Sequence, residues 1–183
     1  APLSDPVRAA LDRVVDLVEE GYELAIRGGV LGNSGLVARK LAPFRLVTCA
    51  SPDYLKRHGV PKAPRDLLDH NCLEFAHGSS GRRWHFHGRS GKQTIQIKGN
   101  LKINNGAALR EATLSGLGII MQPEALVADD IAAGRLVQVL PNFQSASRTL
   151  HIVYLPDRRL SPKLRSFIDF MVERFGEDSA RLR

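Results

Sequence analysis

The sequence is poor in the residues that define several classes of protein. Only two cysteines occur in 183 residues, Cys49 and Cys72, and both sit in apolar stretches, so we predict buried reduced thiols rather than a disulfide framework. No apolar run is long enough to span a bilayer, and Asp5 and Arg8 stand where a signal peptide would need an apolar region. These absences favour a cytoplasmic chain with no membrane partner.

Catalytic motifs are missing as well. The segment Gly32, Asn33, Ser34, Gly35 lacks the glycine pattern of a nucleophile elbow, and the Gly-Leu-Gly of residues 116–118 is only half of a dinucleotide fingerprint. Asp129 and Asp130 are neighbours in a predicted helix, so they point in different directions and form no acid/base pair. The sequence therefore predicts no enzyme activity and no cofactor.

A predicted hairpin holds the one pair of residues that suggests a metal. Residues 84–87 and 93–98 alternate on either side of a Gly-rich turn, which places His85 and His87 on one face. Two imidazoles on a common face could bind a metal, but no Cys, Asp or Glu joins them at a convincing spacing. We therefore predict solvent-facing histidines opposite buried Trp84 and Phe86, and no metal site.

The charge is strongly basic but dispersed. The net charge is +7, and the basic residues stand in small groups such as Arg82 with Arg83 and Arg158 with Arg159. No aromatic residues interleave with them, and no helix-turn-helix pattern accompanies them. A solvated surface explains this charge better than direct DNA binding by this segment.

Residues 99–141 are the most informative part of the chain, because strand and helix signals alternate there. A strand at 101–103 precedes a helix that Gly116 ends, and the apolar run 119–121 is typical of a buried parallel strand. Pro123 begins a second helix, which Gly134 ends before a strand at 135–140. This order is β-α-β-α-β, an arrangement that binds small molecules at the carboxyl ends of its strands.

The start of the first helix in this segment is a candidate ligand site. Asn104, Asn105 and Gly106 stand directly before helix-forming residues, and an Asn at the N-cap satisfies some of the free amides there. The remaining N–H groups and the helix dipole favour an anionic or carbonyl group. Plain capping, with water as the only ligand, is the alternative reading.

The rest of the chain continues the α/β pattern. Apolar spacing predicts a helix over residues 11–18, and a Gly-rich loop spans 28–35. The stripe of residues 164, 167, 168, 171, 172 and 175 predicts a helix packed on a core, with a polar tail after 176. The other predicted elements are strands at 24–27, 45–49, 72–75 and 150–155 and short helices at 53–58 and 64–69.

Five motifs in matching order resemble the effector-binding domain of LysR-type transcriptional regulators. The resemblance covers nearly all of residues 11–175, and the ordered set is far more specific than any one member. The motifs are VVDLVEEGYELAIRGG at 14–29, LVARKLAP at 36–43, LVTCASPDYLKRHGVPKAPRDLLDHNCL at 46–73, NNGAALREATLSGLGIIMQP at 104–123 and RLSPKLRSFIDFMVERF at 159–175.

The resemblance implies an α/β fold like that of type 2 periplasmic binding proteins, with two lobes joined by two crossover strands. The crossovers would be residues 45–50 and 149–155. Lobe one would hold residues 1–46 plus 149–183, and lobe two residues 47–148. The family's domain opens with a strand and helix that APLSDPVRAA does not match, so we expect lobe one to lack them. Their loss would remove effector contacts from lobe one.

In function, the resemblance implies a domain that senses a small-molecule effector in a cleft between the lobes and so modulates DNA binding and transcription. The implied partners are that effector, further copies of the chain in a homodimer or homotetramer, and promoter DNA reached only through a helix-turn-helix domain absent from this chain. The implied effector contacts are Arg27, Ala50, Ser51, Asn104, Asn105, Gly106, Ala107 and Gly118.

Capping explains Ser51 and the asparagines equally well, and packing or an ion pair could explain Arg27. The alternative function is a stand-alone solute-binding protein of the same fold, which the missing signal peptide argues against.

Overall fold

The computed structural model describes residues 17, 19, 21–28, 35–76, 82–89, 91–145, 148–156 and 161–176. They form two compact units: the first holds the described residues of Arg45–Ala146, and the second those of Val14–Phe44 and Ser147–Arg183. Within its described residues the chain therefore passes between the units twice. The helix predicted at 11–18, except for Leu17, the interior of the loop at 28–35 and the tail after Gly176 lie outside the described residues.

The first unit is built on a mixed sheet. Strand β3 (Leu46–Ala50) lies between β8 (Ile120–Pro123) and β9 (Val137–Val139) and runs antiparallel to both. Strand β4 (Glu74–Phe75) pairs in parallel with β7 (Lys102–Ile103), and a parallel bridge between Cys72 and Ile119 joins these strands to β8. Among these strands only β3 runs in the opposite direction to the rest, since the chain enters it from the second unit. The prediction of a parallel strand at 119–121 is therefore correct on the β4 side and wrong on the β3 side.

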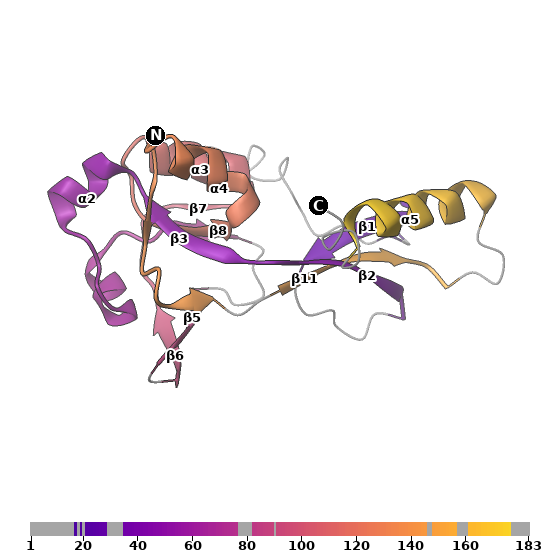
Figure 1. Ribbon diagram of the computed structural model, residues 1–183, viewed down its shortest axis with the longest axis horizontal. Coiled ribbons are helices and arrows are strands. Elements are labelled where there is room, and N and C mark those ends of the chain that lie inside the picture. Colours follow the sequence, from indigo (N-terminus) through magenta and orange to yellow (C-terminus); the bar gives the residue numbers. More distant parts are fainter. Residues whose placement is uncertain are drawn as a thin grey trace. The chain divides into compact units, whose positions relative to one another are not determined.

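Two helices cover one face of this sheet. Helix α3 (Gly106–Leu114) connects β7 to β8, and α4 (Glu124–Ala132) connects β8 to β9, which confirms the β-α-β-α-β order (Figure 1). Because side chains alternate along a strand, Val47, Cys49 and Ile120 share this face. They pack with Leu109 of α3 and Val127 of α4 in a single buried cluster.

The opposite face packs on shorter elements: helix α2 (Pro52–His58), the 3-10 helix η1 (Pro64–Asp69), and strands β5 (Arg83–Gly88), β6 (Gly91–Gln96) and β10 (Gln144–Ser145). Trp84 and Phe86 of β5 are buried in this second cluster. His87 is exposed, and the half-buried His85 lies 2.8 Å from the Thr94 hydroxyl (Nδ1 to Oγ1). The predicted hairpin, with its aromatic side chains buried and its histidines turned outward, is confirmed.

The two cysteines lie in different clusters, Cys49 beneath α3 and α4 and Cys72 on the opposite side of the sheet. Both are free and fully buried. Burial raises the pKa of each thiol to about 12. The prediction of buried reduced thiols is confirmed.

A buried carboxylate joins the two helices of the first unit. Asp130 of α4 is completely buried. Arg110 of α3 donates hydrogen bonds to its carboxylate from Nε and, at 2.9 Å, from Nη2. Arg135, in the turn before β9, donates from Nε at 2.8 Å to the same carboxylate. The guanidinium of Arg110 holds the pKa of Asp130 below its ordinary range. Asp130 therefore ties α3, α4 and the approach to β9 together.

Tyr54 of α2 and His70 are buried side by side, and the exposed His58 lies next to them. The Tyr54 hydroxyl accepts a hydrogen bond from the N–H of Asn71 at 2.9 Å and lies 3.2 Å from Nδ1 of His70. The ring of His58 stacks on Tyr54 with centroids 4.5 Å apart. Burial lowers the pKa of His70, and the charge of His58 lowers it further. Both effects favour the neutral form of His70.

The second unit is a three-stranded antiparallel sheet in the order β1 (Leu24–Gly28), β11 (Arg148–Tyr154), β2 (Val37–Phe44). Helix α5 (Pro162–Phe175) lies along one face of it (Figure 1). Most of β2 was not predicted, because its alternation is weak and it contains Pro43. An edge strand tolerates a proline, since one side of its backbone has no ladder to complete.

The predicted apolar stripe of α5 is only partly correct. Leu164, Ile168, Met171 and Val172 pack on the sheet, but Phe167 is 44% exposed and Phe175 is 50% exposed. Phe167 lies one residue before Ile168, which turns it by about 100° from the core face. Phe175 falls in the last turn of α5. The prediction that both phenylalanines pack on the core is therefore wrong.

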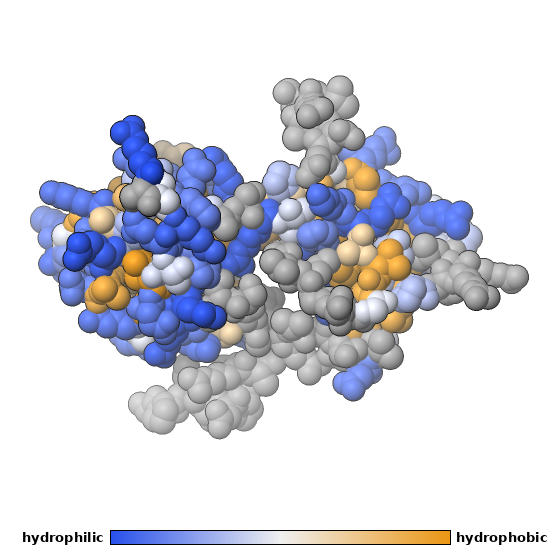
Figure 2. All heavy atoms as spheres, turned by 90° about the horizontal axis from the view of Figure 1, so that it is seen from below, coloured by the Kyte–Doolittle hydropathy of each residue, from blue (hydrophilic) through white to orange (hydrophobic). Residues whose placement is uncertain are grey.

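Polar side chains dominate the visible surface of both units, with apolar atoms in small groups (Figure 2). None of the helices in the described part of the chain combines the length and apolar character needed to cross a membrane.

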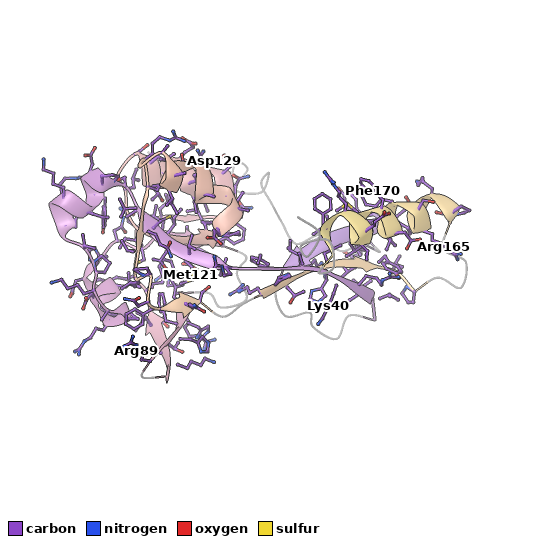
Figure 3. The ribbon with its side chains drawn as sticks, viewed as in Figure 1. Lys40, Arg89, Met121, Asp129, Arg165 and Phe170 are labelled. Atoms are coloured by element: carbon purple, nitrogen blue, oxygen red, sulfur yellow. The ribbon has the colours of Figure 1, made fainter. Side chains whose placement is uncertain are left out.

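Replacing Asp130 by alanine leaves two guanidinium groups beside an emptied buried site. We expect Asp130→Ala to lower the free energy of unfolding by about 3–5 kcal/mol, measured by urea denaturation. Asp129→Ala is the matched control, because Asp129 is exposed on the outer side of α4 (Figure 3). It should change stability by less than about 0.5 kcal/mol. Equal losses in both variants would show that Asp130 has no special role.

The lowered pKa of His70 predicts a pH dependence. As the pH falls, His70 takes up a proton in the unfolded chain before it does so in the folded chain. The contribution of neutral His70 to stability is therefore complete above its ordinary pKa of 6.5 and is lost as the pH falls towards the pKa of His70 in the folded chain. The free energy of unfolding should therefore decrease between about pH 7.5 and about pH 5.5, and His70→Gln should flatten that slope. His87→Gln is the exposed control and should keep it. A slope that survives in His70→Gln would contradict the assignment.

Candidate functional site

The candidate site in the first unit begins at the N-terminus of α3. Asn105 is the N-cap, and its Oδ1 accepts a hydrogen bond from the N–H of Ala108 at 2.9 Å. This bond leaves the N–H groups of Gly106 and Ala107 without a partner inside the helix. Asn104 is half-buried and Ala107 is exposed, so the helix start can be reached from solvent. The predicted capping is confirmed.

Gly106 packs closely against two neighbouring side chains. A Cβ atom added there would lie 3.1 Å from Cδ1 of Leu126 and 3.3 Å from Oε1 of Gln122. Gly106 therefore lets β8 and α4 approach the helix start closely. It also brings the Oε1 of Gln122 next to the start of α3.

Gln122 is the functional candidate that sequence reasoning missed. It is only 4% exposed, and its Oε1 lies beside Gly106 at the start of α3. A polar side chain buried this deeply is unusual, so its position beside the helix start is informative. A polar residue at the end of the apolar run Ile119, Ile120, Met121 was the signal in the sequence that pointed to it.

The same end of the sheet is fixed where the chain arrives from the second unit. Arg45 forms an ion pair with Glu124, the first residue of α4, with an Nη2 to Oε2 distance of 2.9 Å. The N–H of Glu124 also bonds to the Arg45 carbonyl at 2.9 Å. On the other side of β3, the hydroxyl of Ser145 donates to the Leu46 carbonyl at 2.9 Å. The edge beside Gln122 is therefore well anchored.

Three other predicted site residues have packing or capping roles. Ala50 is fully buried, and Ser51 caps α2 by accepting the N–H of Tyr54 at 3.3 Å. Gly118 is buried so closely that an added Cβ would lie 2.3 Å from the Asn71 carbonyl oxygen. All three contact the protein itself.

The structure does not bring these two groups of residues together. Gln122 and Pro123 lie opposite Val47 and Leu46 at the start of β3, whereas Ala50 and Ser51 follow its end. An added Cβ at Gly116, just beyond α3, would lie 3.6 Å from the Ser51 hydroxyl, so Ser51 lies near the C-terminal end of that helix. The nine residues of α3 span about 13 Å. The predicted set therefore divides between opposite ends of the sheet.

Arg27, the remaining predicted residue, belongs to the second unit. It is half-buried in β1 and lies opposite His151 of β11. In the described part of the chain, no three His, Cys, Asp or Glu residues gather in a group that could hold a metal ion.

Comparison with known proteins adds a family and several relatives. A family model described as the LysR substrate binding domain matches residues 7–176. The HTH-type transcriptional regulator CrgA of Neisseria meningitidis serogroup B is 36% identical over 166 residues, covering 90% of this chain and 55% of CrgA. The uncharacterized HTH-type transcriptional regulator YhjC of Escherichia coli is 35% identical over 162 residues, covering 87% of this chain and 54% of YhjC. The chain thus spans about half the length of the curated relatives it matches.

Solved structures give the same result for the fold. The CrgA regulatory domain of Neisseria meningitidis superposes with a TM-score of 0.76 at 36% identity, covering 87% of this chain and 78% of that one. Full-length AphB, the Vibrio cholerae virulence activator, superposes with a TM-score of 0.74 at 27% identity, covering 89% and 55%. The two-lobed fold like that of periplasmic binding proteins, expected from the sequence motifs, is confirmed.

Because Gln122 is a functional candidate, its replacement by a side chain of similar length should cost the fold little. We expect Gln122→Met to change the free energy of unfolding by less than about 1.5 kcal/mol in urea denaturation. Gln138→Met, at an exposed position of β9, should leave stability unchanged. A larger loss of stability in Gln122→Met would mean that the amide already serves the fold.

Proposed function

The chain belongs to the family of LysR substrate binding domains, and from this membership we propose that it is the effector-sensing domain of a LysR-type transcriptional regulator. In this role the domain binds a small molecule and changes how the full-length regulator acts at its promoters. The relatives are named as HTH-type transcriptional regulators, which supports a helix-turn-helix contact with promoter DNA in the whole protein. Assembly as a homodimer or homotetramer is part of the same proposal.

The observation that carries the ligand-binding part is the buried Gln122 amide beside the start of α3. Two backbone donors and one side-chain amide meet where Gly106 lets the backbone approach closely. A carboxylate or carbonyl oxygen accepts hydrogen bonds from such donors, and the dipole of α3 favours negative charge at that end. We assign Asn104, Asn105, Gly106, Ala107 and Gln122 to this half of the site.

The position of these residues in the first unit fits a sensing role. They lie at the end of the sheet where β3 enters from the second unit, next to the ion pair of Arg45 with Glu124. Ala50, Ser51 and Gly118 lie at the other end, where their side chains or backbone already pack or cap. We therefore leave these three out of the proposed contacts. The division into lobes at residues 1–46 plus 149–183 and 47–148 is retained as part of the proposal.

A thermal-shift screen of small carboxylates and aromatic acids tests the proposal. A ligand present at a hundred times its Kd stabilises the folded chain by about 2.7 kcal/mol, which corresponds to a rise in Tm of roughly 5–10 °C for a chain of this size. Calorimetry on each active compound then gives its Kd. We expect Gln122→Met to weaken binding about tenfold, because one hydrogen bond to the ligand is lost.

Two further variants sharpen this test. Asn105→Asp keeps a good N-cap and places a negative charge at the helix start, so it should weaken the binding of an anionic compound while leaving Tm nearly unchanged. Gln138→Met repeats the chemical change of Gln122→Met at an exposed position and should bind like the unaltered chain. Equal affinities for the unaltered chain, Gln122→Met and Asn105→Asp would overturn the assigned site.

A further inference from the structure

The β5–β6 hairpin of the first unit carries basic side chains on one of its faces. Strand β5 contributes Arg83, His85 and His87 at alternate positions, and Lys92 of β6 lies directly opposite His87. Alternate residues of a strand, and directly opposite residues of antiparallel strands, project from the same face. The turn between the strands adds Arg89. We call Arg83, His85, His87, Arg89 and Lys92 the basic face.

The basic face is turned towards solvent. The other residues of β5, Trp84 and Phe86, are buried in the core of the first unit, so the two faces of the strand differ sharply. Arg83, Arg89 and Lys92 are exposed. Figure 1 shows the hairpin projecting from the rest of the first unit, and Figure 3 labels Arg89 near its tip. A large partner can therefore reach this face.

The strands of this sheet supply no acidic residue to balance the charge. Strands β5, β6 and β10 contain no Asp or Glu, and the sequence has none between Glu74 and Glu111. Glu74 is nearly buried and is already engaged by Arg82 at 3.1 Å and by Lys102 at 3.2 Å. Basic residues that stand in small groups along the chain are thus brought together on one positively charged face.

Polar side chains lie among the basic ones. Thr94 and Gln96 of β6 and Gln144 of β10 are exposed, and each lies directly opposite a member of the basic face. Hydroxyl and amide groups donate hydrogen bonds to phosphate oxygens, as Arg and Lys side chains do. The face therefore offers both charge and hydrogen-bond donors to a partner that carries phosphates.

The distribution of apolar side chains favours duplex nucleic acid over other polyanions. Single-strand binders stack bases on accessible aromatic rings, whereas Trp84 and Phe86 are buried. Membrane-surface segments add exposed apolar side chains, and among the described residues none of the exposed large apolar ones lies on β5, β6 or β10. From Arg83 to His87 the face runs for about 13 Å, over which a duplex presents about eight phosphate charges.

We propose that the basic face binds the phosphate backbone of duplex DNA without reading its sequence. Arg83, Arg89 and Lys92 neutralise phosphates, and the polar side chains between them donate hydrogen bonds to phosphate oxygens. In the whole regulator this contact would be a second one with the promoter, beside that of the helix-turn-helix. That placement rests on the proposed function, whereas the affinity of the chain for duplex DNA does not.

Fluorescence anisotropy with the whole 183-residue chain and a labelled duplex of arbitrary sequence tests the proposal. We expect saturable binding whose association constant falls with salt between about 20 and about 200 mM potassium chloride, with a log–log slope of about −3 for three phosphate contacts. No effector is present, so failure here leaves the effector-sensing proposal standing. The same strand without its complement should bind more weakly. Equal or tighter binding of the single strand would overturn the choice of duplex.

A triple variant tests which side chains are responsible. Arg83→Gln, Arg89→Gln and Lys92→Gln together should weaken duplex binding more than about tenfold and bring the salt slope close to zero, since each lost phosphate contact reduces the slope by about 1. All three positions are exposed, so the Tm should change little.

The second unit provides a control with the same change of charge. Lys40→Gln, Arg165→Gln and Arg174→Gln together also remove one Lys and two Arg charges from exposed positions, and should bind the duplex like the unaltered chain. Equal losses in the two triple variants would show attraction by net charge alone and would overturn the proposal. So would binding of vesicles of phosphatidylcholine and phosphatidylserine by a chain that does not bind the duplex.

Discussion

The buried ion pair of Asp130 with Arg110 is the interaction on which the first unit depends. A carboxylate with no exposed surface is stable only while its partners remain, and those partners come from α3 and from the turn before β9. Arg110, in the middle of α3, therefore fixes the position of this helix against α4. Because a helix is rigid over nine residues, fixing its middle also fixes its first turn.

The position of that first turn decides what the unit can recognise. Gly106 brings the turn against β8 so closely that a methyl group would touch Leu126 and the Gln122 amide. The capping oxygen of Asn105 uses one backbone donor and leaves two others facing outward. The first turn of α3 is therefore defined by three features together: the ion pair in the middle of the helix, the close packing of Gly106 and the cap of Asn105.

The sequence allowed most of the elements to be predicted, because their signals are local. Pro and Gly mark the ends of α2, α3 and α5, and alternation marks the β5–β6 hairpin. Two kinds of feature were missed. Strand β2 carries almost no pattern of its own and is held by its register with β11. The direction of β3 depends on where the chain enters the sheet, which no local pattern records.

The sequence also could not show how the predicted contacts are distributed: Ser51 and Asn105 both look like caps in sequence, and only the fold shows that α3 separates them.

Burial of both cysteines gives the chain a practical property. Cys49 and Cys72 are the only thiols in the sequence, each is fully enclosed, and each has a pKa of about 12. Thiolate is the reactive form, so both residues are nearly inert towards maleimides and iodoacetamides near neutral pH. A cysteine introduced at exposed Ala107 would be the preferred target of such reagents. The natural chain is therefore a ready background for attaching a single fluorophore beside the start of α3.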